Sequence, residues 1–179
     1  MRRVLLAALL LAGCAPKLPK EGTGYAFLVD RSGSMSPAAK EAAVRRTLYE
    51  VDGLPDGARV TVFRIGARTE EIFSGEVGEF ELADLATTLR RHVSRPARHT
   101  NLPRAFAAAA SWCARSPGEK RLRFLTDGMN DALDAASVKR MRDAAAAITK
   151  ARPKEILFHG VRAGYREPLR TLLPSATFR

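Results

Sequence analysis

Short apolar runs recur along the chain and alternate with longer segments of mixed polarity. The apolar runs predict strands at residues 25–29, 59–65, 121–126, 155–161 and 176–179. Most of these runs are nearly continuous in apolar residues, which is typical of strands buried on both faces of a sheet. A turn-length gap after the second run allows residues 70–73 to add a short edge strand as a hairpin.

Between the strands, apolar residues recur at three- and four-residue intervals, which indicates helices. The expected helices span residues 37–51, 82–93, 102–114, 137–152 and 167–173. Strands that alternate with helices form βαβ units. We therefore expect an α/β fold with a mostly parallel sheet, one antiparallel edge strand and helices on both faces. A length of 179 residues suits one such domain, which we place at 24–179.

The first residues have the form of a secretory signal. Arg2 and Arg3 precede an apolar run at 4–11, which is too short to span a bilayer as a helix. The ending Leu-Ala-Gly-Cys at 11–14 resembles the lipobox of bacterial lipoproteins. That resemblance implies that residues 1–13 are removed as a signal peptide and that Cys14 becomes an acylated first residue. The alternatives are an ordinary signal peptide with a chance cysteine, or a short buried helix.

Residues 14–23 would then form the lipidated cysteine and a tether, since two prolines and two glycines there disfavour both helix and central strand. Several acyl chains would anchor the protein stably to a membrane. By resemblance to lipoproteins of Gram-negative bacteria, Ala15 favours the outer membrane, with the domain facing the periplasm. The second cysteine, Cys113, lies in an alanine-rich helical segment and is expected to be a buried thiol.

Charge narrows the classes of partner. Thirty Lys and Arg against nineteen Asp and Glu give a formal net charge of +11. A basic surface attracts polyanions, but these residues are scattered and no aromatic run interleaves with them. We therefore expect no specific nucleic-acid binding. Neither a Cys-x-x-Cys pair nor a Cys/His cluster occurs, which argues against structural zinc.

Five oxygen-bearing side chains stand at positions that a parallel sheet would bring to one edge. Asp30 and Asp127 each follow a predicted strand, and ligands bind beyond the carboxyl ends of such strands. Ser32 and Ser34 share the loop of Asp30, and Thr100 opens a predicted helix. Hard oxygen ligands suit Mg²⁺ or Mn²⁺ and do not suit zinc or copper. The alternative is that these side chains only cap helices.

The Asp-x-Ser-x-Ser loop, the Thr-Asn pair and the Thr-Asp-Gly sequence together resemble the von Willebrand factor A domain and its metal-ion-dependent adhesion site. The resemblance spans residues 24–179 and implies a Rossmann-like, doubly wound fold. It also implies a bound Mg²⁺ or Mn²⁺, with hydroxyls as direct ligands and carboxylates binding directly or through water. The residues that match the site are Asp30, Ser32, Ser34, Thr100 and Asp127.

One departure from the family pattern concerns charge. Arg98 and His99 precede Thr100, where family members often have small residues. These side chains could oppose the metal and weaken its binding, or they could select an anionic ligand.

The expected function is that of a membrane-anchored binding module. Its metal would bind a carboxylate offered by a protein partner in the bacterial cell envelope. The alternative is a basic lipoprotein that holds anionic envelope polymers without a metal. We expect no enzymatic activity, because the sequence has neither a Gly-x-Ser-x-Gly elbow nor a phosphate-binding Gly-x-x-x-x-Gly-Lys loop.

Overall fold

The sheet organises the molecule. In the computed structural model, residues 22–179 are described except 95–96, 98 and 131–133. Six strands form one sheet in the order β3-β2-β1-β4-β5-β6. Their bounds are β1 Gly24–Asp30, β2 Arg59–Ile65, β3 Glu70–Glu76, β4 Lys120–Leu125, β5 Glu155–His159 and β6 Thr177–Phe178. All neighbouring pairs are parallel except β2 and β3. The predicted mostly parallel sheet with one antiparallel edge strand is therefore confirmed.

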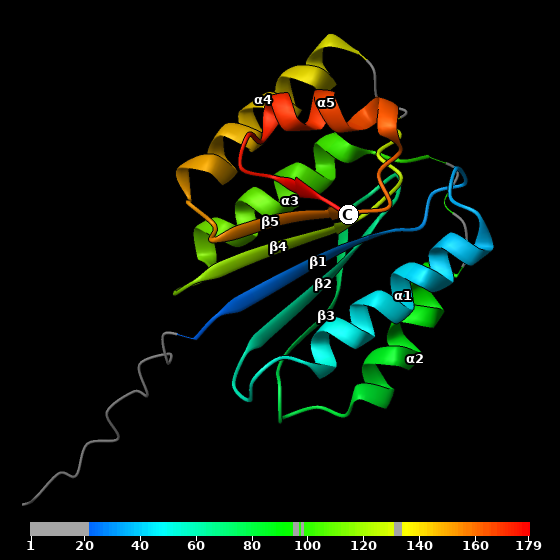
Figure 1. Ribbon diagram of the computed structural model, residues 1–179, viewed down its shortest axis with the longest axis vertical. Helices are drawn as coiled ribbons and strands as arrows, with labels where there is room; N and C mark the ends of the chain where they lie inside the picture. The colour runs from blue at the N-terminus through cyan, green and yellow to red at the C-terminus, as the bar shows by residue number, and fades with distance from the viewer. Residues whose placement is uncertain (1–21, 95–96, 98, 131–133) are drawn as a thin grey trace, which may run out of the picture.

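Helices cover both faces of the sheet (Figure 1). The helices are α1 Pro37–Asp52, α2 Leu82–Val93, α3 Leu102–Arg115, α4 Ala135–Lys150 and α5 Ala163–Leu172. Helices α1 and α2 lie on one face, and α3, α4 and α5 lie on the other. Ser36 caps the N-terminus of α1, since its hydroxyl accepts a hydrogen bond from Ala39 N. Among the described residues, no helix is both long and apolar enough to cross a membrane.

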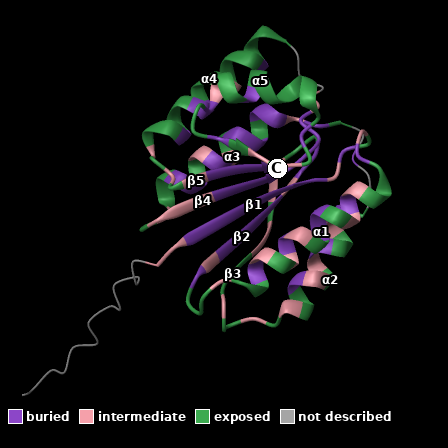
Figure 2. Cartoon of the chain, viewed as in Figure 1, coloured by how far each residue is buried: buried purple, intermediate pink, exposed green. Residues whose placement is uncertain are grey.

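Each face of the sheet has its own hydrophobic core, because side chains alternate along a strand. On β1, Ala26 and Leu28 pack toward α3 and α4, whereas Phe27 and Val29 pack toward α1 and α2. Every residue of β1 is buried, as Figure 2 shows along the central strand. Cys113 lies in the first of these cores, where burial raises the pKa of its thiol to about 11. The expectation of a buried thiol is confirmed.

The structure shifts the bounds of some elements. Strand β5 ends at His159 rather than at residue 161, since Gly160 turns the chain with φ of 82°. Helix α5 begins at Ala163, four residues before the expected start, and contains Pro168 in its interior. A proline there removes a backbone hydrogen bond. Burial of Leu169 and Leu173 in the core offsets that loss.

The parallel strands point their carboxyl ends at one edge of the sheet. Asp30 at the end of β1 is in register with the end of β2, and Val29 with Leu125 at the end of β4. The loops after β1, β4 and β5 therefore meet at this edge, which we call the carboxyl edge. The predicted signal peptide at 1–13, the acylated Cys14 and most of the tether lie outside the described residues.

Candidate metal centre at the carboxyl edge

Asp30 is fully buried at the centre of the carboxyl edge. Its Oδ1 accepts a hydrogen bond from Ser32 N (2.7 Å), and its Oδ2 accepts one from the Thr126 hydroxyl (2.7 Å). Burial raises the pKa of Asp30, and the charge of Asp127 adds to this effect, against the lowering effect of the two hydrogen bonds. The carboxylate is thus held rigidly in a place that disfavours its negative charge.

The two serine hydroxyls of this loop face each other. Ser32 Oγ lies 2.8 Å from Ser34 Oγ, so both oxygens are directed to one region. Ser32 is buried, and its backbone forms a parallel bridge with Ala97. The loop after β1 is therefore tied to the segment that leads into α3.

Asp127 follows β4 and is also buried. Its Oδ1 accepts a hydrogen bond from Met129 N (3.0 Å). Its buried Oδ2 accepts no hydrogen bond within the described part of the chain, although Arg162 Nη2 lies 3.1 Å away. A side chain at Gly128 would meet Val161 and Tyr165 at 3.0 Å, and its φ is 83°, so this turn needs glycine.

Thr100 is buried on a segment fixed from both sides. Ala97 N donates to Arg31 O (2.9 Å), which joins the segment to the loop of Asp30. Leu102 N donates to the Asn130 side chain (3.2 Å), which joins it to the loop of Asp127. The segment therefore lies at the carboxyl edge between these two loops.

The structure thus brings all five predicted residues to one edge. The hydrogen bond from Thr126 to Asp30 links the loops of the two acids directly. Of the two residues expected to influence the metal, His99 is exposed, and Arg98 lies outside the described residues.

Sequence reasoning missed two contributors, Thr126 and Arg162. Thr126 orients Asp30, and Arg162 contacts Asp127. Arg162 stands three residues after β5, and the rule that carboxyl ends share one edge could have indicated it.

The donor set consists of oxygens alone. In the described residues, no group of three or more His, Cys, Asp or Glu side chains could hold a metal ion. A cation here would depend on two carboxylates together with hydroxyls. Oxygen donors fit Mg²⁺ or Mn²⁺. The buried Oδ2 of Asp127 accepts no hydrogen bond from the described residues, so it could act as a ligand of such an ion. The residues present therefore fit the group that the sequence predicted.

No protein-family model matches the sequence, and neither does any curated protein sequence. Solved structures do match. A von Willebrand factor type A protein from Catenulispora acidiphila superposes with a TM-score of 0.71 over 88% of this chain, at 21% identity. The chain has the von Willebrand factor A fold.

Other structures with this similarity include metal-loaded proteins. Proximal thread matrix protein 1 from the mussel byssus, described with a zinc-occupied MIDAS motif, gives a TM-score of 0.65 at 16% identity over 88% of this chain. The manganese-loaded TRAP protein of Plasmodium vivax gives 0.63 at 14% identity, over 89% of this chain and 68% of its own. The chain spans only 38% of the Catenulispora protein and 41% of the mussel protein.

A pocket of about 550 Å³ adjoins the site on the α1 side of this von Willebrand factor A fold. It shares Ser34 and Asp127 with the candidate metal centre, and Arg162 lines it as well. Apolar side chains from α1 and β4, including Ala39 and Leu125, form other parts of its wall. A ligand group at the metal centre would therefore have space beside it for the atoms that follow.

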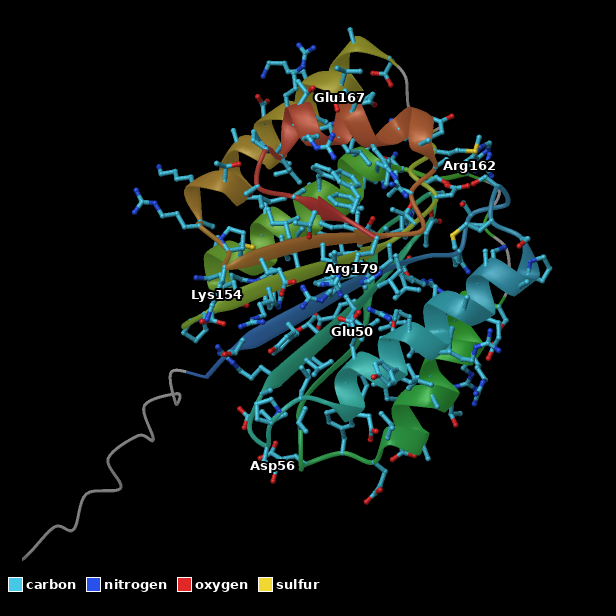
Figure 3. The ribbon with its side chains drawn as sticks, in the orientation of Figure 1. Glu50, Asp56, Lys154, Arg162, Glu167 and Arg179 are labelled. Atoms are coloured by element: carbon cyan, nitrogen blue, oxygen red, sulfur yellow. The ribbon has the colours of Figure 1, made fainter. Side chains whose placement is uncertain are left out.

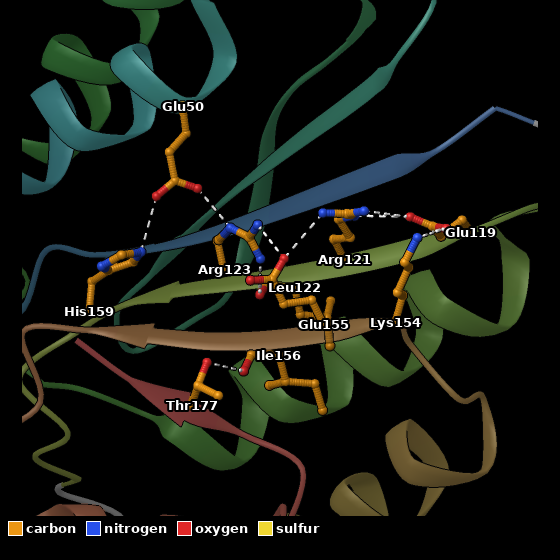
Figure 4. A network of polar contacts seen from close by, with 10 residues as sticks. All are labelled: Glu50, Glu119, Arg121, Leu122, Arg123, Lys154, Glu155, Ile156, His159 and Thr177. Carbon is orange, nitrogen blue, oxygen red and sulfur yellow. Dashed lines mark hydrogen bonds and ion pairs between the residues drawn. The ribbon is translucent and has the colours of Figure 1, made fainter. Parts of the chain in front are cut away.

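A second charged group lies between α1 and strands β4 and β5, on the face of the sheet that α1 covers (Figure 4). Arg123 on β4 is 8% exposed and lies 2.7 Å from both Glu50 on α1 and Glu155 on β5. Glu50 also contacts Arg46 (2.8 Å) and His159 Nε2 (3.1 Å). Burial acts to raise the pKa of Glu50, but the polar contacts from His159, Arg123 and Arg46 outweigh it and lower the pKa to about 2.

Proposed function

We propose that this protein is a binding module that uses Mg²⁺ or Mn²⁺ at the carboxyl edge to hold an acidic group of a protein partner. The observation that carries the proposal is the convergence of Asp30, Ser32, Ser34 and Asp127, with the serine hydroxyls 2.8 Å apart. Their oxygens, with that of Thr100, would hold the ion.

Charge counting supports an acidic ligand. Two carboxylates and one divalent cation sum to zero, so the ion keeps affinity for a further anion where the protein leaves a coordination position open. When bound, the ion would supply a positive charge, and a carboxylate of the partner could fill the open position in its coordination shell. The serine and threonine hydroxyls add oxygen donors without adding negative charge. The protein therefore does not cancel the charge of the ion with further carboxylates, and the bound ion can still attract an anion.

We further propose that the module works on the bacterial cell envelope. In this proposal residues 1–13 direct export and are removed, and acylated Cys14 anchors the domain, facing the periplasm from the outer membrane. The support is the order of charge, apolar run, small residues and cysteine in the sequence. Mass spectrometry of the mature protein tests it. A diacyl or triacyl group on Cys14 is expected, and an intact Met1 would contradict it.

The metal centre is tested by calorimetric titration with Mg²⁺. The wild-type protein should bind one ion per chain, and Asp127→Ala should weaken binding at least tenfold, about 1.4 kcal/mol. Asp143→Ala is the matched control, because Asp143 is an exposed acid on α4 paired with Lys139. Equal binding by wild type and Asp127→Ala, or none by wild type, would remove the proposal.

The partner is tested by crosslinked capture from cell envelopes in Mg²⁺ or in EDTA. A captured protein that disappears in EDTA and in Asp127→Ala supports the proposal. Capture that responds to salt but not to EDTA would instead support the alternative of a basic protein that binds anionic polymers.

A further inference from the structure

Arg162 joins two of the loops that form the candidate metal centre. Its Nη2 lies 3.1 Å from Asp127 Oδ2 and donates a hydrogen bond to Ser34 O (3.1 Å). Its backbone N–H donates to Asp127 O (3.1 Å) at the start of α5. Figure 3 places Arg162 among the loops of the carboxyl edge, remote from Lys154 at the opposite edge.

The position of this guanidinium changes the charge of the site. Asp30 and Asp127 contribute −2, and Arg162 brings the sum to −1. A divalent ion would then give +1, whereas without Arg162 the loaded site would be neutral. An arginine beside Asp127 therefore opposes a metal cation and attracts an anionic ligand, and its side chain is 54% exposed and so accessible to that ligand.

We propose that Arg162 is a specificity-determining residue that lowers the affinity of the centre for its metal and raises the affinity of the loaded centre for a carboxylate. This inference rests on the proposed function. The fork of the guanidinium suits a carboxylate, to which it can donate two parallel hydrogen bonds. In the free protein Arg162 offsets the negative charge of Asp127. In the complex it would be a second contact, beside the metal, for the carboxylate of the partner.

Two titrations of Arg162→Gln test the two halves of the proposal. In calorimetry with Mg²⁺ alone, the variant should bind the ion about fivefold more tightly than wild type, the size expected for a partly exposed charge pair. With Mn²⁺ bound, displacement of metal-bound water by acetate can be followed by water-proton relaxation. Acetate should bind the variant about fivefold more weakly. A merely structural role for Arg162 would not move these two affinities in opposite directions.

Arg166→Gln is the matched control, since it removes the same charge from α5, where Arg166 donates to Val161 O. The Mg²⁺ and acetate affinities of Arg166→Gln should stay within twofold of the wild-type values. Arg162→Lys keeps the positive charge and should therefore have nearly the metal affinity of the wild type. Unchanged or weaker Mg²⁺ binding by Arg162→Gln, or unchanged acetate binding, would overturn the role of Arg162 alone. Absence of Mg²⁺ binding in wild type would remove that role and the proposed function together.

Discussion

Two groups of carboxylates on this domain, one at Asp30 and Asp127 and the other at Glu50 and Glu155, differ in how their negative charge is balanced. At the carboxyl edge, Asp30 is neutralised by no arginine or lysine contact of the described residues, and burial raises its pKa. Farther back, Glu50 contacts Arg46, Arg123 and His159, and its pKa falls to about 2. The carboxylates of the Glu50 group are balanced by cationic side chains within the protein, whereas at the carboxyl edge only Asp127 has an arginine beside it among the described residues, and the two acids with Arg162 still sum to −1.

The difference shows which group is structural. A charge network complete within the protein gains nothing from an added ion, and breaking it leaves buried charge uncompensated. A group with excess negative charge and rigidly held oxygens is stabilised by a cation from outside. The same α/β framework thus places beside α1 a network whose charges are balanced within the protein, and at the loops of the carboxyl edge a group of acids that an added cation would stabilise.

The largest effect is expected from breaking the complete network. Arg123→Ala would leave Glu50 and Glu155 without their shared cation and should lower the free energy of unfolding by about 3 kcal/mol. Urea denaturation measures the change. Lys139→Ala, which breaks an exposed pair on α4, should cost less than about 0.5 kcal/mol. Similar losses in the two variants would mean that the network contributes no more than a surface pair.

The pH dependence of stability sharpens the contrast. The native pKa of Glu50 lies below its ordinary value of 4.5, so its ionised form stabilises the fold above about pH 4.5. This contribution is lost as the pH falls toward about 2. The stability difference between wild type and Glu50→Gln should therefore shrink by about 2 kcal/mol between pH 5 and pH 2, allowing for solvent screening. A difference that stays constant over this range would contradict the assignment.

The smallest expected change in stability comes from the carboxyl edge, and it is an increase where the changes above are losses. Without metal, Asp30→Asn removes a buried charge and should slightly raise the free energy of unfolding. The same change should abolish any rise in melting temperature caused by Mg²⁺. Thermal melts with EDTA and with Mg²⁺ measure both effects. Destabilisation in EDTA would show that hydrogen bonding by the carboxylate outweighs the cost of its burial.

The fold was largely predictable because its strands are nearly all apolar and are separated by amphipathic helices. Every predicted strand and helix is present, and the errors fall at ends. Strand β3, expected at 70–73, extends to Glu76, because an edge strand with one exposed side alternates in polarity. Helix α5 starts four residues before the expected position, because the burial of Leu169 and Leu173 in the core, which depends on tertiary packing, holds the helix around Pro168.

The candidate site was predictable only as far as its residues lie on a recognisable loop. Asp30 and Asp127 follow apolar strands, and strand direction alone brings their loops together. The contact of Arg162 with Asp127 depends on the turn at Gly160 and on the start of α5, which no pattern in the sequence specifies. Side-chain partners across loops follow from tertiary packing rather than from spacing.

Strand β1 begins at Gly24 and ends at Asp30, so the chain enters the domain at one edge of the sheet and reaches the candidate site about 20 Å away, after a single strand. A pull applied between a partner held there and whatever precedes Gly24 would run along one covalent backbone. Strand β1 is hydrogen-bonded to β2 on one side and to β4 on the other. These two ladders of hydrogen bonds would together resist the removal of β1 from the sheet under such a load.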